Sequence, residues 1–245
     1  MAAKKTRIDV HLVDSGLVAT RSRAQALIMA GKILVNDVKI DKSGELVDPE
    51  SNIRIIEDEH PWVSRGALKL LKGLEYFDID PAQKVCLDAG ASTGGFTEVL
   101  LTRDAAMVHA VDVGYGQLDW KIRNDPRVKV YERTNIRDLK PGELDPPPAL
   151  AVCDVSFISL KLVIPVFMSV LVPGSDVICL IKPQFEAGKG RVGKGGVVRD
   201  PQVRQECIDS IVSFLREKNI EPTGTCESPI TGPKGNVEYL IHFKV

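Results

Sequence analysis

Two residues that directly follow predicted strands could carry out proton-transfer chemistry. Asp154 follows the apolar run 150–153, and Lys182 follows the apolar run 177–181. Because the carboxyl ends of parallel strands meet at one edge of a sheet, these side chains must face a cleft or lose solvation. The pair could be only a salt bridge that closes the sheet. Alternatively, a lysine whose pKa is shifted by its neighbours could orient or deprotonate a weakly acidic hydroxyl group.

A glycine-rich turn within residues 85–96 has the features of a cofactor site. An apolar run, 85–87, predicts a buried strand before the turn, and an amphipathic segment predicts a helix after it. This arrangement brings a backbone and a helix N-terminus close to a ligand. The dehydrogenase pattern G-x-G-x-x-G is not matched, because Ser92 replaces its second glycine. The acidic residue before the turn suits the cationic amino-acid part of S-adenosylmethionine better than a pyrophosphate, although a plain turn of another α/β enzyme is an alternative. The expected cofactor contacts are Asp88, Gly90, Ala91, Ser92, Gly94, Gly95 and Phe96.

Polar residues also follow the second and third predicted strands. Asp112 lies 22 residues beyond Gly90, where an acidic side chain accepts hydrogen bonds from a ribose diol. Asn135 and Asp138 follow the third strand, where an adenine edge would lie. Each of these residues could instead cap a helix. We expect Asp112 and Asn135 to bind the cofactor.

A basic loop, residues 188–196, follows the fifth predicted strand. It holds five glycines and three cations in nine residues, a composition that favours a mobile loop. A Walker-type nucleotide loop is not indicated, because no Gly-Lys-Ser/Thr sequence precedes a helix here. We expect a lid that binds RNA phosphates through Lys189, Arg191 and Lys194, with a merely flexible connector as the alternative.

Composition limits the class of protein. A chain of 245 residues has room for one large and one small domain, and 44% hydrophobic with 27% charged residues is ordinary for a globular protein. The net charge of −1 predicts no nucleic-acid partner from the whole-chain balance, so any basic patch must be local. Five cysteines without CxxC spacing favour a reducing compartment and no metal site. We expect a cytoplasmic protein without membrane segments, because neither a signal peptide nor a membrane-length apolar run is apparent.

Apolar runs alternate with helical segments in the larger, C-terminal part of the chain. This alternation is typical of an α/β domain with a mostly parallel sheet and helices on both faces. The last run follows a Pro- and Gly-rich turn, and we expect it to form a hairpin with residues 223–227. The runs that predict strands are 85–87, 108–111, 128–131, 150–153, 177–181 and 239–243.

The first 57 residues predict a small α+β module. Helical spacing over residues 8–13, a second helix after Thr20 or Ser22, and alternation over 33–40 around an Asn-Asp turn indicate two helices and a small sheet.

Charge within this part of the chain is unevenly distributed. Residues 1–42 hold eight Lys and Arg against four Asp, whereas residues 43–62 hold one Arg against six acidic residues. A basic face of this kind could contact phosphates, or it could be the solvated face of a structural module.

Several short motifs in this module resemble the S4 RNA-binding domain. That resemblance implies RNA binding through the second helix and the neighbouring strand, with Arg7, Arg21, Arg23 and Lys32 as phosphate contacts. The matching motifs are Arg7-Ile8-Asp9-x-x-Leu12, Gly16-Leu17, Thr20-Arg21-Ser22-x-Ala24 and Ile28-x-Ala30-Gly31-x-Ile33-x-Val35-Asn36.

Four residues of the larger region resemble the K-D-K-E tetrad of the FtsJ-like ribose 2′-O-methyltransferases. They are Lys69, which alone would predict a surface position, Asp154, Lys182 and Glu238. Together with the S4 motifs, the whole chain is similar to the TlyA (hemolysin A) family, whose members methylate cytidines of ribosomal RNA. Asn135 departs from the pattern, since FtsJ-type enzymes often have an aspartate near the adenine. The matching contexts are Arg65-x-x-x-Lys69-Leu70, Asp88-x-Gly90-Ala91-x-x-Gly94-Gly95-Phe96, Asp154-Val155-Ser156-Phe157-Ile158-Ser159 and Lys182-Pro183-Gln184-Phe185-Glu186.

The resemblance implies an S-adenosylmethionine-dependent enzyme with a Rossmann-like methyltransferase sheet and an N-terminal S4 domain. Lys182 would orient and deprotonate a ribose 2′-hydroxyl, Asp154 would hold this lysine and lie against the cofactor, and Lys69 and Glu238 would set the local field. The expected domains are an S4-like domain over residues 1–57, a linker over 58–63 and an FtsJ-like domain over 64–245.

Three other functions fit parts of the sequence. A base methyltransferase is the nearest rival, but Asp145-Pro146-Pro147-Pro148 precedes the fourth strand instead of following it, and Cys153 and Cys179 lie inside strand-like runs. A pore-forming hemolysin lacks support because no signal peptide or membrane-length segment is apparent. A non-catalytic RNA-binding protein of the ribosome would leave the glycine turn and the tetrad unexplained.

Overall fold

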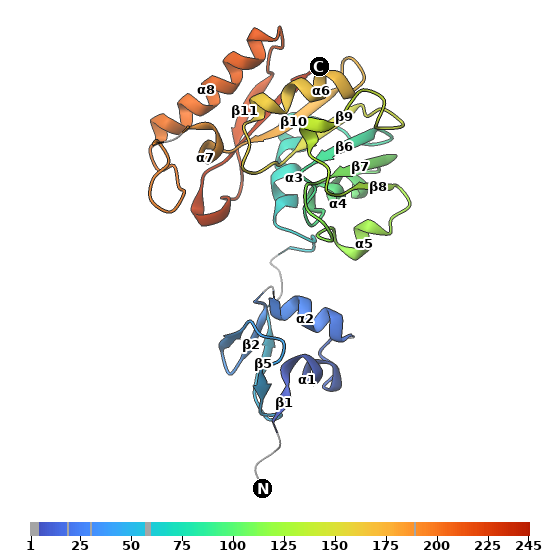
Figure 1. Cartoon of the computed structure of the whole chain (residues 1–245), viewed down its shortest axis with the longest axis vertical. Coiled ribbons are helices and arrows are strands. Elements are labelled where there is room, and N and C mark those ends of the chain that lie inside the picture. The colour runs from blue at the N-terminus through green and yellow to red at the C-terminus, as the bar shows by residue number, and fades with distance from the viewer. Residues whose placement is uncertain (1–4, 19, 30, 57–59, 189) are drawn as a thin grey trace. The chain divides into compact units, whose positions relative to one another are not determined.

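The computed structural model describes residues 5–18, 20–29, 31–56, 60–188 and 190–245 (Figure 1). The chain divides into two compact units, Met1–Pro61 and Trp62–Val245. No helix in these described ranges is long and apolar enough to cross a membrane.

The first unit contains two helices and short antiparallel strands, as predicted. Its hairpin turns at Asn36 and Asp37, whose φ angles of 49° and 64° are those of a tight two-residue turn. Thr20 is the N-cap of the second helix, because its hydroxyl accepts a hydrogen bond from Arg23 N at 3.2 Å. The elements are β1 (Thr6–Arg7), α1 (Ile8–Asp14), α2 (Arg21–Met29), β2 (Ile33–Val35), β3 (Val38–Ile40), β4 (Leu46–Val47) and β5 (Ile53–Ile55).

The second unit is built on a seven-stranded sheet of order β11-β12-β10-β9-β6-β7-β8. The five strands from β10 to β8 are parallel, and β12 is antiparallel to both of its neighbours. The expected hairpin between the last two strands is therefore confirmed. The strands are β6 (Val85–Ala89), β7 (Met107–Val111), β8 (Val128–Tyr131), β9 (Leu150–Cys153), β10 (Asp176–Ile181), β11 (Gly224–Glu227) and β12 (Tyr239–Lys244).

Helices pack on both faces of this sheet, and the alternating side chains of each strand explain why. In β10, Ile178 and Leu180 join one core with α3 and α4, whereas Val177, Cys179 and Ile181 join the other core with α6 and α8. The helices are α3 (Gly66–Tyr76), α4 (Gly95–Thr102), α5 (Trp120–Arg123), α6 (Ile164–Val170), α7 (Pro183–Glu186) and α8 (Pro201–Glu217), with 3₁₀ turns η1 (Ile136–Asp138), η2 (Leu160–Leu162) and η3 (Pro233–Gly235).

The strand order brings the segments after β6, β9 and β10 and the start of β12 to one edge of the sheet. The chain runs outward from β6 to β7 and β8, and then returns to the other side of β6 as β9 and β10. Ligands bind at such a reversal, beyond the carboxyl ends of the strands. Because β12 runs antiparallel to β10, with Tyr239 opposite Ile181, its first residue lies at this same edge.

Candidate active site

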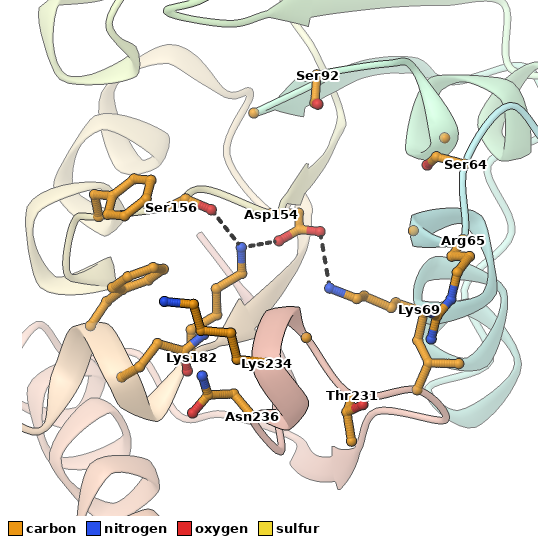
Figure 2. A pocket seen from close by; sticks show the side chains of 18 of the residues that line it. Ser64, Arg65, Lys69, Ser92, Asp154, Ser156, Lys182, Thr231, Lys234 and Asn236 are labelled. Atoms are coloured by element: carbon orange, nitrogen blue, oxygen red, sulfur yellow. Dashed lines mark hydrogen bonds and ion pairs between the residues drawn. The ribbon is translucent and has the colours of Figure 1, made fainter. Parts of the chain in front are cut away.

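A cavity of about 960 Å³ lies at this edge of the second unit (Figure 2). Its walls come from the start of α3, the turn after β6, the segments after β9 and β10, the glycine-rich loop, and the loop before β12. A volume of this size suits a cofactor together with part of a substrate.

The tetrad expected from the sequence forms one connected chain of charges. Lys182 Nζ lies 2.6 Å from Asp154 Oδ1, and Lys69 Nζ lies 3.4 Å from Asp154 Oδ2. Lys69 Nζ also lies 2.7 Å from Glu238 Oε2. Figure 2 shows both lysines converging on Asp154 from opposite sides. The structure thus brings together four residues that are up to 169 positions apart in sequence.

Three members of the tetrad are buried and Asp154 is partly exposed, and the tetrad opens onto the cavity. Lys69, Asp154 and Lys182 line the cavity wall, whereas Glu238 is fully buried behind Lys69. Burial alone lowers the pKa of Lys69, but the Asp154 and Glu238 carboxylates outweigh this effect and raise the pKa above its ordinary value. Lys69 therefore stays positively charged at neutral pH.

Two further side chains complete the hydrogen bonding of the tetrad. Ser156 Oγ lies 3.0 Å from Lys182 Nζ, and Gln184 Nε2 donates to Glu238 Oε1 at 3.2 Å. Neither was predicted as a site residue, although both lie within the motifs that gave the family resemblance. Their positions two residues after Asp154 and Lys182 were the available signal.

An aromatic pair, the exposed Phe157 and the half-buried Phe185, lies on the same wall. Phe157 is 91% exposed and has a φ of 65°, a conformation that non-glycine residues rarely adopt. Its ring centroid lies 5.0 Å from that of Phe185, and both residues line the cavity. Hydrophobic patterning could not identify Phe157, because patterning places large apolar side chains inside.

The glycine turn after β6 forms another part of the cavity wall. Gly90 has a φ of 87°, and a Cβ there would come within 2.8 Å of the Asp154 carbonyl oxygen. The turn therefore needs glycine for both its backbone angle and its close approach to β9. The predicted cofactor residues that line the cavity are Gly90, Ala91, Ser92, Gly95, Phe96 and Asp154.

Four other predicted cofactor residues do not line this cavity. Asp112 supports the turn, since its carboxylate accepts hydrogen bonds from Ser92 N at 2.8 Å and from Gly114 N at 2.7 Å. Asn135 caps η1 by accepting from Arg137 N at 3.1 Å, which is the alternative that the sequence left open. Gly94 is the N-cap residue of α4 and has a φ of 97°.

Asp88 is the fourth of these residues and is fully buried. Its Oδ2 accepts a hydrogen bond from Thr97 Oγ1 at 2.6 Å, and its Oδ1 has no hydrogen-bond partner among the described residues. Burial raises the pKa of Asp88 to about 7. Among the residues that the structure describes, no cation lies beside this carboxylate beneath the turn.

The two described cations of the glycine-rich loop, Arg191 and Lys194, do not line the cavity. Arg191 forms an ion pair with Glu206 of α8, and Lys194 is exposed. Lys189 lies outside the described residues. The loop contributes Val192, Gly195 and Gly196 to the cavity wall instead.

Two predicted RNA contacts of the first unit are bound to a buried carboxylate. Asp9 is fully buried and accepts from Arg7 Nε at 3.0 Å, Arg21 Nε at 2.9 Å and Gln25 Nε2 at 3.0 Å. The hydrogen bond from Arg7 is the main reason that the pKa of Asp9 lies well below its usual value. Both guanidinium groups remain about half exposed, Arg23 is exposed, and Lys32 is half-buried.

Family comparisons agree with both units. The FtsJ-like methyltransferase family matches residues 62–245, and the S4 domain matches residues 6–53. The 16S/23S rRNA (cytidine-2′-O)-methyltransferase TlyA of Mycobacterium tuberculosis is 48% identical over 99% of this chain and 91% of that protein. Hemolysin A of Brachyspira hyodysenteriae is 40% identical over 97% of this chain and 99% of that protein.

A solved structure described as a hemolysin from Streptococcus thermophilus is also similar. It is 39% identical, with a TM-score of 0.75, and the match covers 99% of this chain and 89% of that chain. The predicted fold class, a Rossmann-like methyltransferase sheet with an N-terminal S4 domain, is confirmed. The chain belongs to the FtsJ-like methyltransferase family, and it carries an S4 domain at its N-terminus.

Proposed function

We propose that this protein transfers the methyl group of S-adenosylmethionine to the 2′-hydroxyl of a cytidine in ribosomal RNA. The observation that carries the proposal is the connected chain Lys182–Asp154–Lys69–Glu238 on the wall of a large cavity. A relative that is 48% identical over nearly the whole chain is named for this activity.

Several features of the glycine turn support S-adenosylmethionine as the cofactor. Gly90, Ala91 and Ser92 present backbone to the cavity, and Asp112 holds the Ser92 amide in place. The unpaired Oδ1 of Asp88 beneath this turn leaves one acceptor for a donor that the described chain does not provide. Gly90, Ala91 and Ser92 would hold the cofactor, which supplies the electrophilic methyl group when it is bound.

The chain's own residues would then align the substrate and move its proton. In an in-line displacement the 2′-oxygen forms a bond to the methyl carbon as the carbon–sulfur bond breaks, so the oxygen must be held opposite the sulfur. We assign Lys182 Nζ the role of orienting this hydroxyl and, as the neutral amine, of accepting its proton, which converts the amine into an ammonium group. Asp154 holds Lys182 at 2.6 Å, and Ser156 fixes the amine from a second direction at 3.0 Å.

Lys69 and Glu238 would act by setting the position and charge of Asp154. The raised pKa of Lys69 keeps it cationic, so it holds Asp154 in its ionised form instead of acting as a base. Glu238 balances this charge from a fully buried position. Both are therefore positioning residues in this scheme.

Substrate binding would combine both units. The S4 domain supplies a module typical of RNA-binding proteins, with Arg23 exposed on α2. Phe157 and Phe185 offer aromatic surfaces beside the tetrad on which an unpaired base could stack. A base methyltransferase that uses a cysteine nucleophile has less support, because Cys153 and Cys179 are fully buried.

The test is methyl transfer from labelled S-adenosylmethionine to purified 30S and 50S subunits and to intact ribosomes, followed by nuclease digestion and mass mapping. We expect labelled 2′-O-methylcytidine. Label on a base would replace the proposal with a base methyltransferase. Cofactor binding without label on any particle would overturn ribosomal RNA as the substrate, and the absence of cofactor binding would favour a non-catalytic RNA-binding protein.

A further inference from the structure

We propose that Lys234 binds an RNA phosphate next to the target ribose, an inference that rests on the proposed function. Lys234 lies in the loop before β12 and lines the cavity with the tetrad lysines (Figure 2). The sequence did not mark it, since a lysine within Gly232-Pro233-Lys234-Gly235 predicts only an exposed turn.

The charges on the cavity wall leave two basic side chains without an ion-pair partner in the part of the chain that the structure describes. Among the described residues, four basic side chains line the cavity, namely Arg65, Lys69, Lys182 and Lys234, and Asp154 is the single carboxylate. Lys69 and Lys182 are neutralised by Asp154 and by the buried Glu238. Arg65 and Lys234 form no ion pair within the described part of the chain and are exposed. The entrance is therefore positive and complementary to an anion.

The backbone of the turn that carries Lys234 is strained. Lys234 has φ 61° and ψ 14°, in the left-handed region that costs conformational energy for a residue with a side chain. The hydrogen bonds of Gly232 N to the Asn236 oxygen at 2.8 Å and of Gly235 N to the Gly232 oxygen at 3.1 Å hold it there. Strained backbone of this kind is commonly retained where a side chain must point into a site.

This turn is anchored on two sides. The Asn236 side chain is 3% exposed, accepts from Val198 N at 3.1 Å and donates to the Gly196 oxygen at 2.9 Å. On its other side, Gly232 packs against the Glu238 carboxylate so closely that a Cβ would collide with it. The anchors tie the Lys234 turn both to the glycine-rich loop and to the tetrad.

RNA phosphate is the anion that best fits this position. A ribose whose 2′-oxygen is held by Lys182 carries its 3′-phosphate on the adjacent carbon, so a phosphate must enter the same cavity. The other expected anion is the carboxylate of S-adenosylmethionine. Arg65 is nearer to the cofactor turn, because the neighbouring Ser64 packs directly against Gly95. Lys234 belongs instead to the wall formed with Gly195 and Gly196.

The experiment compares the full-length wild type with Lys234→Met, Lys234→Arg and Lys218→Met. Lys218 is an exposed lysine at the far end of α8, so its replacement removes the same charge away from the cavity. Binding of a ribosomal RNA fragment that the wild type methylates is measured from 50 to 300 mM KCl. Cofactor affinity is measured by calorimetry, and methyl transfer is followed in single turnovers.

For Lys234→Met we expect roughly tenfold weaker RNA binding at low salt and a salt slope smaller by about 1. Cofactor affinity should be unchanged, Lys234→Arg should retain most RNA affinity, and Lys218→Met should match the wild type. RNA affinity and salt slope equal to those of the wild type in Lys234→Met would overturn this inference alone, as would weaker cofactor binding with unchanged RNA binding. A wild-type protein that binds RNA but methylates no ribose would overturn the proposed function itself.

Discussion

Each of the two units contains an aspartate whose side chain is completely buried. The groups around the two carboxylates differ in charge. Asp9 in the first unit accepts hydrogen bonds from two arginines and a glutamine. Asp88 in the second unit accepts a hydrogen bond from the Thr97 hydroxyl and has no cation beside it in the described part of the chain. The pKa of Asp9 is therefore well below its usual value, whereas burial raises the pKa of Asp88 to about 7.

Asp154 differs from both because its charge cluster opens onto a cavity. Its side chain is 19% exposed and is shared by two lysines, whereas the Asp9 carboxylate is sealed by its partners. All three sites are built on an ordinary aspartate. What separates a structural ion pair from a site for chemistry here is access to space for a substrate, together with the charges that remain unbalanced there.

The largest expected effect is the loss of methyl transfer when Lys182, in the charge cluster that opens onto the cavity, is replaced. Lys182→Ala should lower methyl transfer by about 10³-fold or more, because the proposed proton acceptor is lost. The melting temperature should change by only a few degrees, since Asp154 keeps its ion pair with Lys69. Single-turnover methylation and thermal unfolding measure the two effects.

Lys218→Ala is the matched control and should retain full activity. A Lys182→Ala protein that binds cofactor and RNA and methylates at the wild-type rate would remove Lys182 from the mechanism.

The second prediction concerns the pH dependence of stability that the buried Asp88 carboxylate causes. The folded-state pKa of Asp88 is about 7 and its unfolded value is near 4, so ionisation destabilises the fold as the pH rises between them. Asp88→Asn has no such ionisation. The stability of the variant relative to the wild type should therefore increase by on the order of 3 kcal/mol from pH 4 to pH 8.

Urea unfolding of the second unit at several pH values tests this prediction. Asp209→Asn, at an exposed position on α8, should show no comparable pH dependence. A pH-independent difference for Asp88→Asn would mean that Asp88 is ionised throughout this range.

The third prediction removes the carboxylate that two arginines share. Asp9→Asn should destabilise the first unit by about 2–3 kcal/mol, because two guanidinium groups lose their partner although they remain partly solvated. Hydrogen exchange should accelerate at Ile8 and Leu12 and stay unchanged in α4. In the wild type the lowered pKa of Asp9 means that this stabilisation is complete above about pH 4 and is lost only as the pH falls further.

Asp14→Asn is the control on the same helix, where the side chain is exposed. Equal exchange rates in the Asp9 and Asp14 variants would show that the buried ion pairs contribute little to this unit.

The smallest expected effects are on RNA binding by Arg21 and Arg23, two arginines of α2. Arg21→Gln and Arg23→Gln should each weaken binding of the RNA fragment about threefold to tenfold and reduce the salt slope by about 1. Only Arg21→Gln should also lower the stability of the first unit, by about 0.5–1 kcal/mol, because Arg21 is bound to Asp9. Unchanged RNA binding in Arg23→Gln would show that this face of α2 is not the RNA-binding face.

Local sequence patterns determined the elements of this protein and much of its cavity. The apolar runs predicted six strands of the large sheet, and the Asn-Asp pair predicted the hairpin of the first unit. Asp154 and Lys182 were expected at one edge because each directly follows a buried run, and the structure brings them within 2.6 Å. Their catalytic roles remain predictions.

Only the tertiary structure decided which polar groups meet the cavity. Glu238 reaches Lys69 because β12 inserts antiparallel beside β10, a pairing that local pattern does not encode. Asp88 lies beneath the turn instead of on the cavity wall, and Arg21 is bound to a buried carboxylate. Burial depth and ion-pair choice depend on contacts between residues far apart in the chain, whereas strand and turn signals depend on neighbours. For that reason the sequence by itself determined the elements, and only the packing of those elements decided which charges are sealed and which are open to a substrate.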